Sequence, residues 1–166
     1  GTHQKFIFAQ LEQVLKNPRL NVPTDLPSAL HQVAELIHKR SLVVVFSDML
    51  QTVHDENRIA ALFAALQHLK FNKHEVVLFN VTDKQKEVDF KFENRPYEFV
   101  DMETGAVLKA HTSRVKDAYL QQITSYREQL ALKCSQYKID MVDADINAGF
   151  DSVLQAYLIK RQKMKV

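Results

Sequence analysis

The side chains of this chain that could do chemistry stand where apolar runs end. Asp48 follows the apolar run from Leu42 to Phe46 and a serine. Its carboxylate could bind a divalent cation, directly or through water, because hard cations prefer oxygen ligands. It could equally begin a loop and cap the next turn. Thr24 has the same two alternatives, since its hydroxyl could be a metal ligand or a helix cap.

The other polar candidates are weaker. Asp143 and Asp145 follow the last apolar run and could line the carboxyl edge of a sheet, although solvated loop acids are the simpler interpretation. Cys134 falls on an apolar helical stripe, which favours a small core residue over a nucleophile. None of the seven histidines is paired at the i, i+4 spacing of a helical zinc site, and His31 and His38 are about two turns apart. We therefore expect no histidine metal site.

Composition excludes several classes of function. The chain has 166 residues, of which 46% are hydrophobic and 25% charged, as in one soluble globular domain. A net charge of +2 creates no field that would recruit nucleic acid. No apolar run approaches the length of a membrane span. The single cysteine excludes an internal disulfide and a cysteine zinc site, and favours a reducing, cytoplasmic compartment.

Hydrophobic patterns predict an α/β fold that would position these side chains. Residues 41–48 and 75–81 each contain an unbroken apolar run, at 42–46 and 76–79, which is typical of strands buried on both faces, and we expect the first to lie at the centre of the fold. The helical pattern of residues 56–70 between them makes a parallel crossover unit, and residues 139–142 form a third strand. Further helices are expected at residues 4–16, 24–40, 112–134 and 149–162, and an antiparallel hairpin within residues 84–111. Ligands of such sheets bind outside the carboxyl ends of the strands.

Five stretches together resemble a known family. They are residues 24–30, 42–50, 74–79, 99–105 and 157–161. In order and spacing they resemble the C-terminal half of the von Willebrand factor A-like domain of the "domain of unknown function 58" family, over nearly all of the chain. The resemblance implies a doubly wound α/β fold, here a partial sheet of three parallel strands with an appended hairpin.

The resemblance also implies a metal-ion-dependent adhesion site. Three loops build that site, and they supply an Asp-x-Ser-x-Ser motif, a threonine and an aspartate. Thr24 matches the threonine and Asp48 the aspartate, whereas no Asp-x-Ser-x-Ser occurs in the sequence. We therefore expect residues 1–166 to be the C-terminal part of one domain, whose first strand and metal-site loop precede Gly1. Mg²⁺ is expected in the full-length protein rather than in this part alone.

The implied function is adhesive. Members of the family resemble bacterial partners, or adaptors, of MoxR-type AAA+ ATPases, so we expect a cytoplasmic protein-interaction module. The chain has no glycine-rich phosphate loop and no Gly-x-Ser-x-Gly elbow, and we expect no enzyme. The alternative is a phosphoacceptor domain of the response-regulator type, with Asp48 phosphorylated beside Thr82. That chemistry needs an acidic pair at an earlier strand exit, and none precedes Asp48.

The absence of a first strand has a consequence for the remaining sheet. In the implied fold that strand would pair with residues 41–48. Without it, the strand from Leu42 to Phe46 is an open edge, which is a template for pairing with another chain. We therefore expect self-association along this strand, or a cover formed by residues 4–16.

Overall fold

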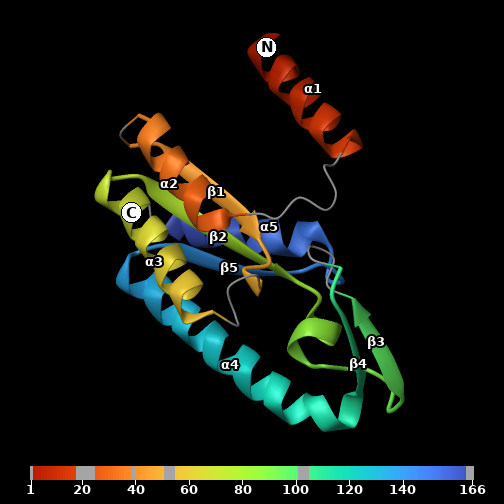
Figure 1. The fold of residues 1–166 in the computed structure, drawn as a ribbon. Coiled ribbons are helices and arrows are strands. Elements are labelled where there is room, and N and C mark those ends of the chain that lie inside the picture. Colours follow the sequence, from red (N-terminus) through yellow and green to blue (C-terminus); the bar gives the residue numbers. More distant parts are fainter. Residues whose placement is uncertain (1, 18–24, 39, 51–54, 101–104, 164–166) are drawn as a thin grey trace. The chain divides into compact units, whose positions relative to one another are not determined.

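The computed structural model describes residues 2–17, 25–38, 40–50, 55–100 and 105–163 (Figure 1). The chain divides into two units, a larger one of residues 25–97 and 110–166 and a smaller one of residues 1–24 and 98–109. In chain order the described elements are α1 (Thr2–Lys16), α2 (Leu26–Leu36), β1 (Leu42–Ser47), α3 (Glu56–Phe71), β2 (Glu75–Thr82), the π-helical turn η2 (Lys84–Val88), β3 (Pro96–Val100), β4 (Val107–His111), α4 (Thr112–Gln136), β5 (Asp140–Asp145) and α5 (Phe150–Lys163).

Three parallel strands form the sheet of the larger unit, in the order β1–β2–β5 (Figure 1). Phe46 of β1 lies opposite Phe79 of β2, and Thr82 of β2 lies opposite Asp145 of β5. The chain passes through α3 between β1 and β2, and through α4 before it reaches β5. The predicted α/β fold with three parallel strands is confirmed.

The predicted position of the first apolar run at the centre of the sheet is wrong. β2 lies at the centre, and its residues 76–80 are all buried. β1 pairs only with β2 among the described strands, and its Leu42, Val44 and Phe46 side chains are 46%, 43% and 61% exposed. An apolar, β-branched run favours a strand, but it carries no information on how many neighbours that strand has. β1 is therefore an edge strand among the described strands, and the separate prediction of an open edge from Leu42 to Phe46 is confirmed for them.

Helices cover both faces of the sheet. The main core lies on one face and contains Leu30 and Ala34 of α2, Leu62, Leu66 and Leu69 of α3, and Tyr126, Leu130 and Cys134 of α4, packed with Val45, Val76 and Leu78 of the strands. On the other face, Phe79 stacks on Phe46 with 4.8 Å between ring centroids, and Tyr157 of α5 meets Phe79 edge-on at 5.5 Å. Cys134 is a buried core residue, as predicted.

Side-chain caps explain where α2 and α3 begin. The carboxylate of Asp25 accepts a hydrogen bond from Ser28 N at 3.3 Å. Asp55 accepts two backbone hydrogen bonds from the first turn of α3, at 2.9 and 3.3 Å. Each bond satisfies an N–H group that has no partner within its own helix. Asp25 is thus the N-cap of α2, and Thr24, the predicted alternative as cap or metal ligand, lies outside the described residues.

The segment between β2 and α4 departs most from its prediction. Residues 88–92 alternate between apolar and charged side chains, which predicts a strand. The structure instead has the turn η2 followed by irregular chain, in which Phe90 is buried with its ring 5.0 Å from that of Tyr119 in α4. The predicted hairpin is confirmed for β3 and β4, and Gly105 before β4 takes a positive φ of 71°.

The first helix agrees with the prediction for residues 4–16. α1 is amphipathic, and its described side chains from residue 3 to residue 16 are exposed. None of the helices in the described part of the chain is both long and apolar enough to span a membrane.

Candidate functional site

The polar side chains that could form a site gather at the carboxyl edge of the sheet. Asp48 follows β1, Asp83 follows β2 and Asp145 ends β5. The three strands are parallel and in register, so their carboxyl ends lie along one edge. This edge is where open α/β sheets bind ligands.

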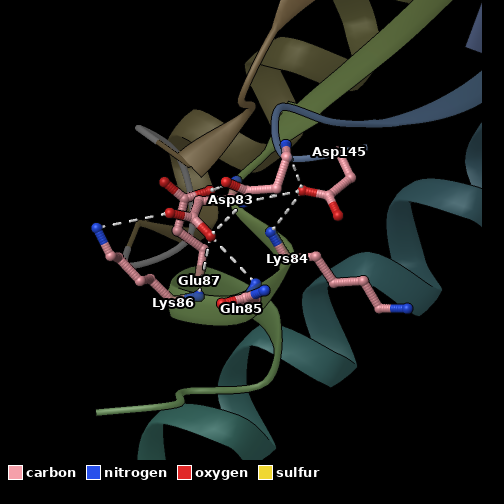
Figure 2. Close-up of polar contacts among 7 residues, drawn as sticks. Asp83, Lys84, Gln85, Lys86, Glu87 and Asp145 are labelled. Atoms are coloured by element: carbon pink, nitrogen blue, oxygen red, sulfur yellow. Dashed lines mark hydrogen bonds and ion pairs between the residues drawn. The ribbon is translucent and has the colours of Figure 1, made fainter. Parts of the chain in front are cut away.

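Asp83 and Asp145 are occupied by hydrogen bonds in the loops that they begin (Figure 2). Asp83 Oδ1 accepts from two backbone N–H groups of η2, at 3.1 and 3.2 Å. Asp145 Oδ1 accepts from Lys84 N at 3.3 Å, and Asn147 Nδ2 donates to both carboxylates, at 3.0 and 3.2 Å. A hydrogen bond from the backbone N–H of Asn147 is the main reason that the pKa of Asp145 is lowered. These two aspartates therefore tie the β2 and β5 loops together.

Glu87 of η2 folds back onto the end of β2. Its Oε2 accepts a hydrogen bond from Asp83 N at 2.9 Å (Figure 2). Burial raises the pKa of Glu87, the hydrogen bond from Asp83 N opposes this rise, and the charges of Asp48 and Asp83 add to it. The carboxylates of Glu87 and Asp48 are thus close enough to interact.

Asp48 begins the loop after β1. Its Oδ1 accepts a hydrogen bond from Leu50 N at 3.2 Å, and Met49 between them has a positive φ of 56°. This is the two-residue bond by which aspartate side chains start turns. Of the two alternatives for Asp48, the loop-starting role is observed. A carboxylate can accept several further bonds, so this contact leaves room for a ligand.

A small cavity, whose exposed walls are mainly apolar, lies beside these carboxylates. Its volume is about 10 Å³, and its polar lining comes from Asp48, Asn80, Thr82, Glu87 and Arg127. A space of this size accommodates about one water molecule. The cavity therefore cannot enclose an organic substrate, and a larger partner would have to approach the sheet edge from outside.

Arg127 of α4 holds the β5 side of the cavity. Its Nη2 donates to Asp143 Oδ1 at 3.0 Å, and Asn80 Nδ2 donates to the same oxygen at 3.0 Å. Arg127 Nη1 is buried and has no hydrogen-bond partner among the described residues. Because β5 continues to Asp145, Asp143 lies within the strand rather than after it. Asp143 is therefore exposed, as its sequence position suggests, but it is a paired carboxylate of a strand rather than a loop acid.

The structure describes one of the two predicted magnesium ligands. Asp48 is in place at the sheet edge, whereas Thr24 lies outside the described residues. Among the residues that the structure describes, no three His, Cys, Asp or Glu side chains are placed to hold a metal ion. An aspartate oxygen suits Mg²⁺, but this ion needs a near-octahedral set of oxygens. The described residues do not form such a set.

Two members of this edge, Glu87 and Arg127, are missing from the sequence prediction. Arg127 could have been found, because it lies four residues after Ile123 and three before Leu130 and so falls beside the buried stripe of α4. Glu87 had no such signal, since the surrounding alternation of apolar and charged residues favours a strand.

A family model matches most of this chain. The family model described as "Protein of unknown function DUF58" matches residues 2–129. No curated protein and no solved structure matches the chain. The match spans α1 to most of α4, including β1, β2 and the carboxylates that follow them. The chain belongs to the DUF58 family of proteins of unknown function.

Proposed function

We propose that this chain is a protein-interaction module that makes and breaks no covalent bond. On this proposal it is part of a von Willebrand factor A-like domain and acts in the cytoplasm with a MoxR-type AAA+ ATPase. The observation that carries the proposal is the position of Asp48, an accessible carboxylate at the carboxyl edge of a parallel sheet in a DUF58 protein. The cavity behind it has room for about one water, which suits contact at a surface better than enclosure of a substrate.

Asp48 and Thr24 are the two residues that would offer oxygen ligands to Mg²⁺ in the full-length protein. Their chemistry is suited to this ion, because magnesium prefers carboxylate, hydroxyl and water oxygens. The remaining ligands would have to come from outside the described residues, which form no metal site alone.

Magnesium titration of the full-length protein tests the role of Asp48. We expect saturable binding by calorimetry in the wild type, and at least tenfold weaker binding in Asp48→Asn, which keeps the shape of the side chain. Asp117→Asn removes an exposed acid from the second turn of α4 and should leave the affinity unchanged. Equal affinities of the wild type and Asp48→Asn would rule out the adhesion site.

Binding to a purified MoxR-type ATPase tests the partner. We expect a complex with the full-length protein in Mg²⁺ that is weakened by a chelator and by Asp48→Asn, but not by Asp117→Asn. A complex that is indifferent to both treatments would place the interface elsewhere on the module. The absence of any complex would reject the ATPase as the partner.

A second candidate is phosphorylation of Asp48. It is favoured by one observation: Thr82, which such chemistry would need nearby, lines the same cavity as Asp48. Incubation with acetyl phosphate should then add the mass of one phosphoryl group to the wild type and not to Asp48→Asn. An unchanged mass in the wild type removes this candidate.

A further inference from the structure

Two histidines from different helices meet on the face of the larger unit that α2 and α3 cover. Nδ1 of His31 in α2 lies 3.0 Å from Nδ1 of His68 in α3. Their ring centroids are 5.2 Å apart and their planes are tilted by 45°. Both side chains are half-buried, so solvent and small ions can reach them. The sequence alone does not reveal this pair, because the i, i+4 spacing of a helical zinc site applies to two histidines of the same helix.

The packing of α2 against α3 holds the two rings in place. One helical turn beyond them, Asn72 Nδ2 donates to Ala34 O at 2.8 Å and so fixes the register of the two helices. Beneath them, Leu30 and Ala34 of α2 belong to the same buried core as Leu66 and Leu69 of α3. Rigid secondary elements position ligand side chains more accurately than loops do.

The distance between the two nitrogens matches that of adjacent ligands on one metal ion. Two imidazole nitrogens on a tetrahedral zinc ion, each about 2.0–2.1 Å from the metal, lie about 3.3–3.4 Å apart. Neighbouring nitrogens of a square-planar ion at the same bond length lie about 2.9 Å apart. The observed 3.0 Å falls between these values, so a small movement of either ring would admit an ion.

We propose that His31 and His68 form a binding site for a divalent transition-metal ion of the zinc, nickel and copper class, bound through both Nδ1 atoms. Imidazole nitrogen suits these ions, whereas Mg²⁺ and Ca²⁺ prefer oxygen. Water fills the other coordination positions, since no third His, Cys, Asp or Glu of the described part joins the pair. The bound ion clamps α2 to α3.

Proton positions are compatible with this site. Without metal, one Nδ1–H donates to the other Nδ1, because each neutral imidazole carries one N–H. On binding, that proton moves to Nε2 of the same ring, so both rings stay neutral and no proton is lost. Each ring then carries its N–H at Nε2.

Zinc titration of the whole chain, free of chelating buffer, tests the site. We expect one saturable zinc ion by calorimetry and a rise in melting temperature, because a ligand that binds only the folded state stabilises it. His31→Ala and His68→Ala should each weaken that binding at least tenfold. His38→Ala is the matched control, since this histidine follows α2 and is exposed. Its affinity should equal that of the wild type.

Nuclear magnetic resonance on the wild type gives a test that needs no variant to fold. Zinc should shift the imidazole resonances of His31 and His68 together and leave those of His38 in place. No saturable binding, or binding that both alanine variants retain, would overturn the proposal. Loss of binding in His38→Ala with shifts confined to His38 would equally overturn it. Neither result bears on Asp48, whose test uses magnesium.

Discussion

At the scale of single residues, the fold changes the protonation of Glu87. Burial raises its pKa above the ordinary 4.5, although the hydrogen bond from Asp83 N opposes the rise. The folded state therefore binds the proton more tightly than the unfolded state does, and the contribution of Glu87 to stability is present below pH 4.5 and lost as the pH rises through the raised pKa.

Replacing the Glu87 carboxyl by an amide should remove the pH dependence of this residue's contribution to stability. We expect the melting temperature of the wild type, relative to Glu87→Gln, to fall as the pH is raised from below 4.5 toward neutrality. Gln129→Asn changes an exposed, uncharged side chain of α4 and should show a constant difference from the wild type. A constant difference for Glu87→Gln as well would show that its environment does not shift its protonation.

At the scale of elements, α3 depends on the cap at its amino end. Asp55 accepts two backbone hydrogen bonds from the first turn, at 2.9 and 3.3 Å. Asp55→Ala should lower the free energy of unfolding by about 1 kcal/mol in urea denaturation, because both N–H groups lose their protein partner. Asp55→Asn should keep nearly all of the stability, since asparagine caps as well as aspartate does. Equal losses in the two variants would assign the effect to charge rather than to the cap.

The edge strand β1 is expected to drive self-association. Ser41 O accepts a hydrogen bond from Glu75 N at 2.9 Å. Alternate residues of a strand face the same neighbour, so Val43 and Val45 of β1 also direct their backbone N–H and C=O groups to β2. Leu42, Val44 and Phe46 then direct theirs to the open edge, and their side chains are exposed as well. Such an edge pairs with other strands unless a charge interrupts it.

A lysine in the middle of this strand should weaken the association. We expect light scattering to report a concentration-dependent mass for the wild type and a lower one for Val44→Lys, because a charge cannot enter a paired apolar edge. Leu132→Lys is the control, since Leu132 is an exposed leucine of α4. A monomeric wild type at high concentration, or the same mass for Val44→Lys, would contradict the prediction.

At the scale of the whole molecule, one core joins three helices to the sheet of the larger unit. Leu66 is fully buried in this core, which also contains residues of α2, α4 and the strands. Leu66→Ala should lower the free energy of unfolding by roughly 2–5 kcal/mol, because the lost contacts leave a cavity. Leu132→Ala removes a leucine that is 58% exposed and should stay within about 0.5 kcal/mol. Urea denaturation followed by circular dichroism measures both.

Local hydrophobic patterns were enough to predict most helices and strands, but not which elements pack against one another. The apolar runs that became β1, β2 and β5, and the helical stripes between them, follow from periodicity, which the backbone imposes locally. Which strand is central depends on contacts made elsewhere in the chain, so the apolar pattern alone wrongly placed β1 at the centre, whereas the family resemblance correctly predicted an edge. Residues 88–92 show the same limit, because Phe90 is held by Tyr119 of a later helix rather than by a strand partner.

The candidate site was predictable only where one residue carried the signal. Asp48 stood out because it ends an apolar run. The bonds from Arg127 and Asn80 to Asp143, and the contact between His31 and His68, join residues that are far apart in sequence. Sequence spacing does not predict these contacts, since they arise from the register of the strands and the packing of the helices.

The order in which a ribosome makes this chain gives the position of β2 a further consequence. The strand on one side of β2 is synthesised shortly before it, whereas β5 emerges only after the hairpin and the whole of α4. For that interval the nascent chain exposes the second side of its most buried strand, and we expect chaperones to hold it there. Force-sensitive translational arrest should accordingly report folding only when the arrest point lies well beyond Asp145.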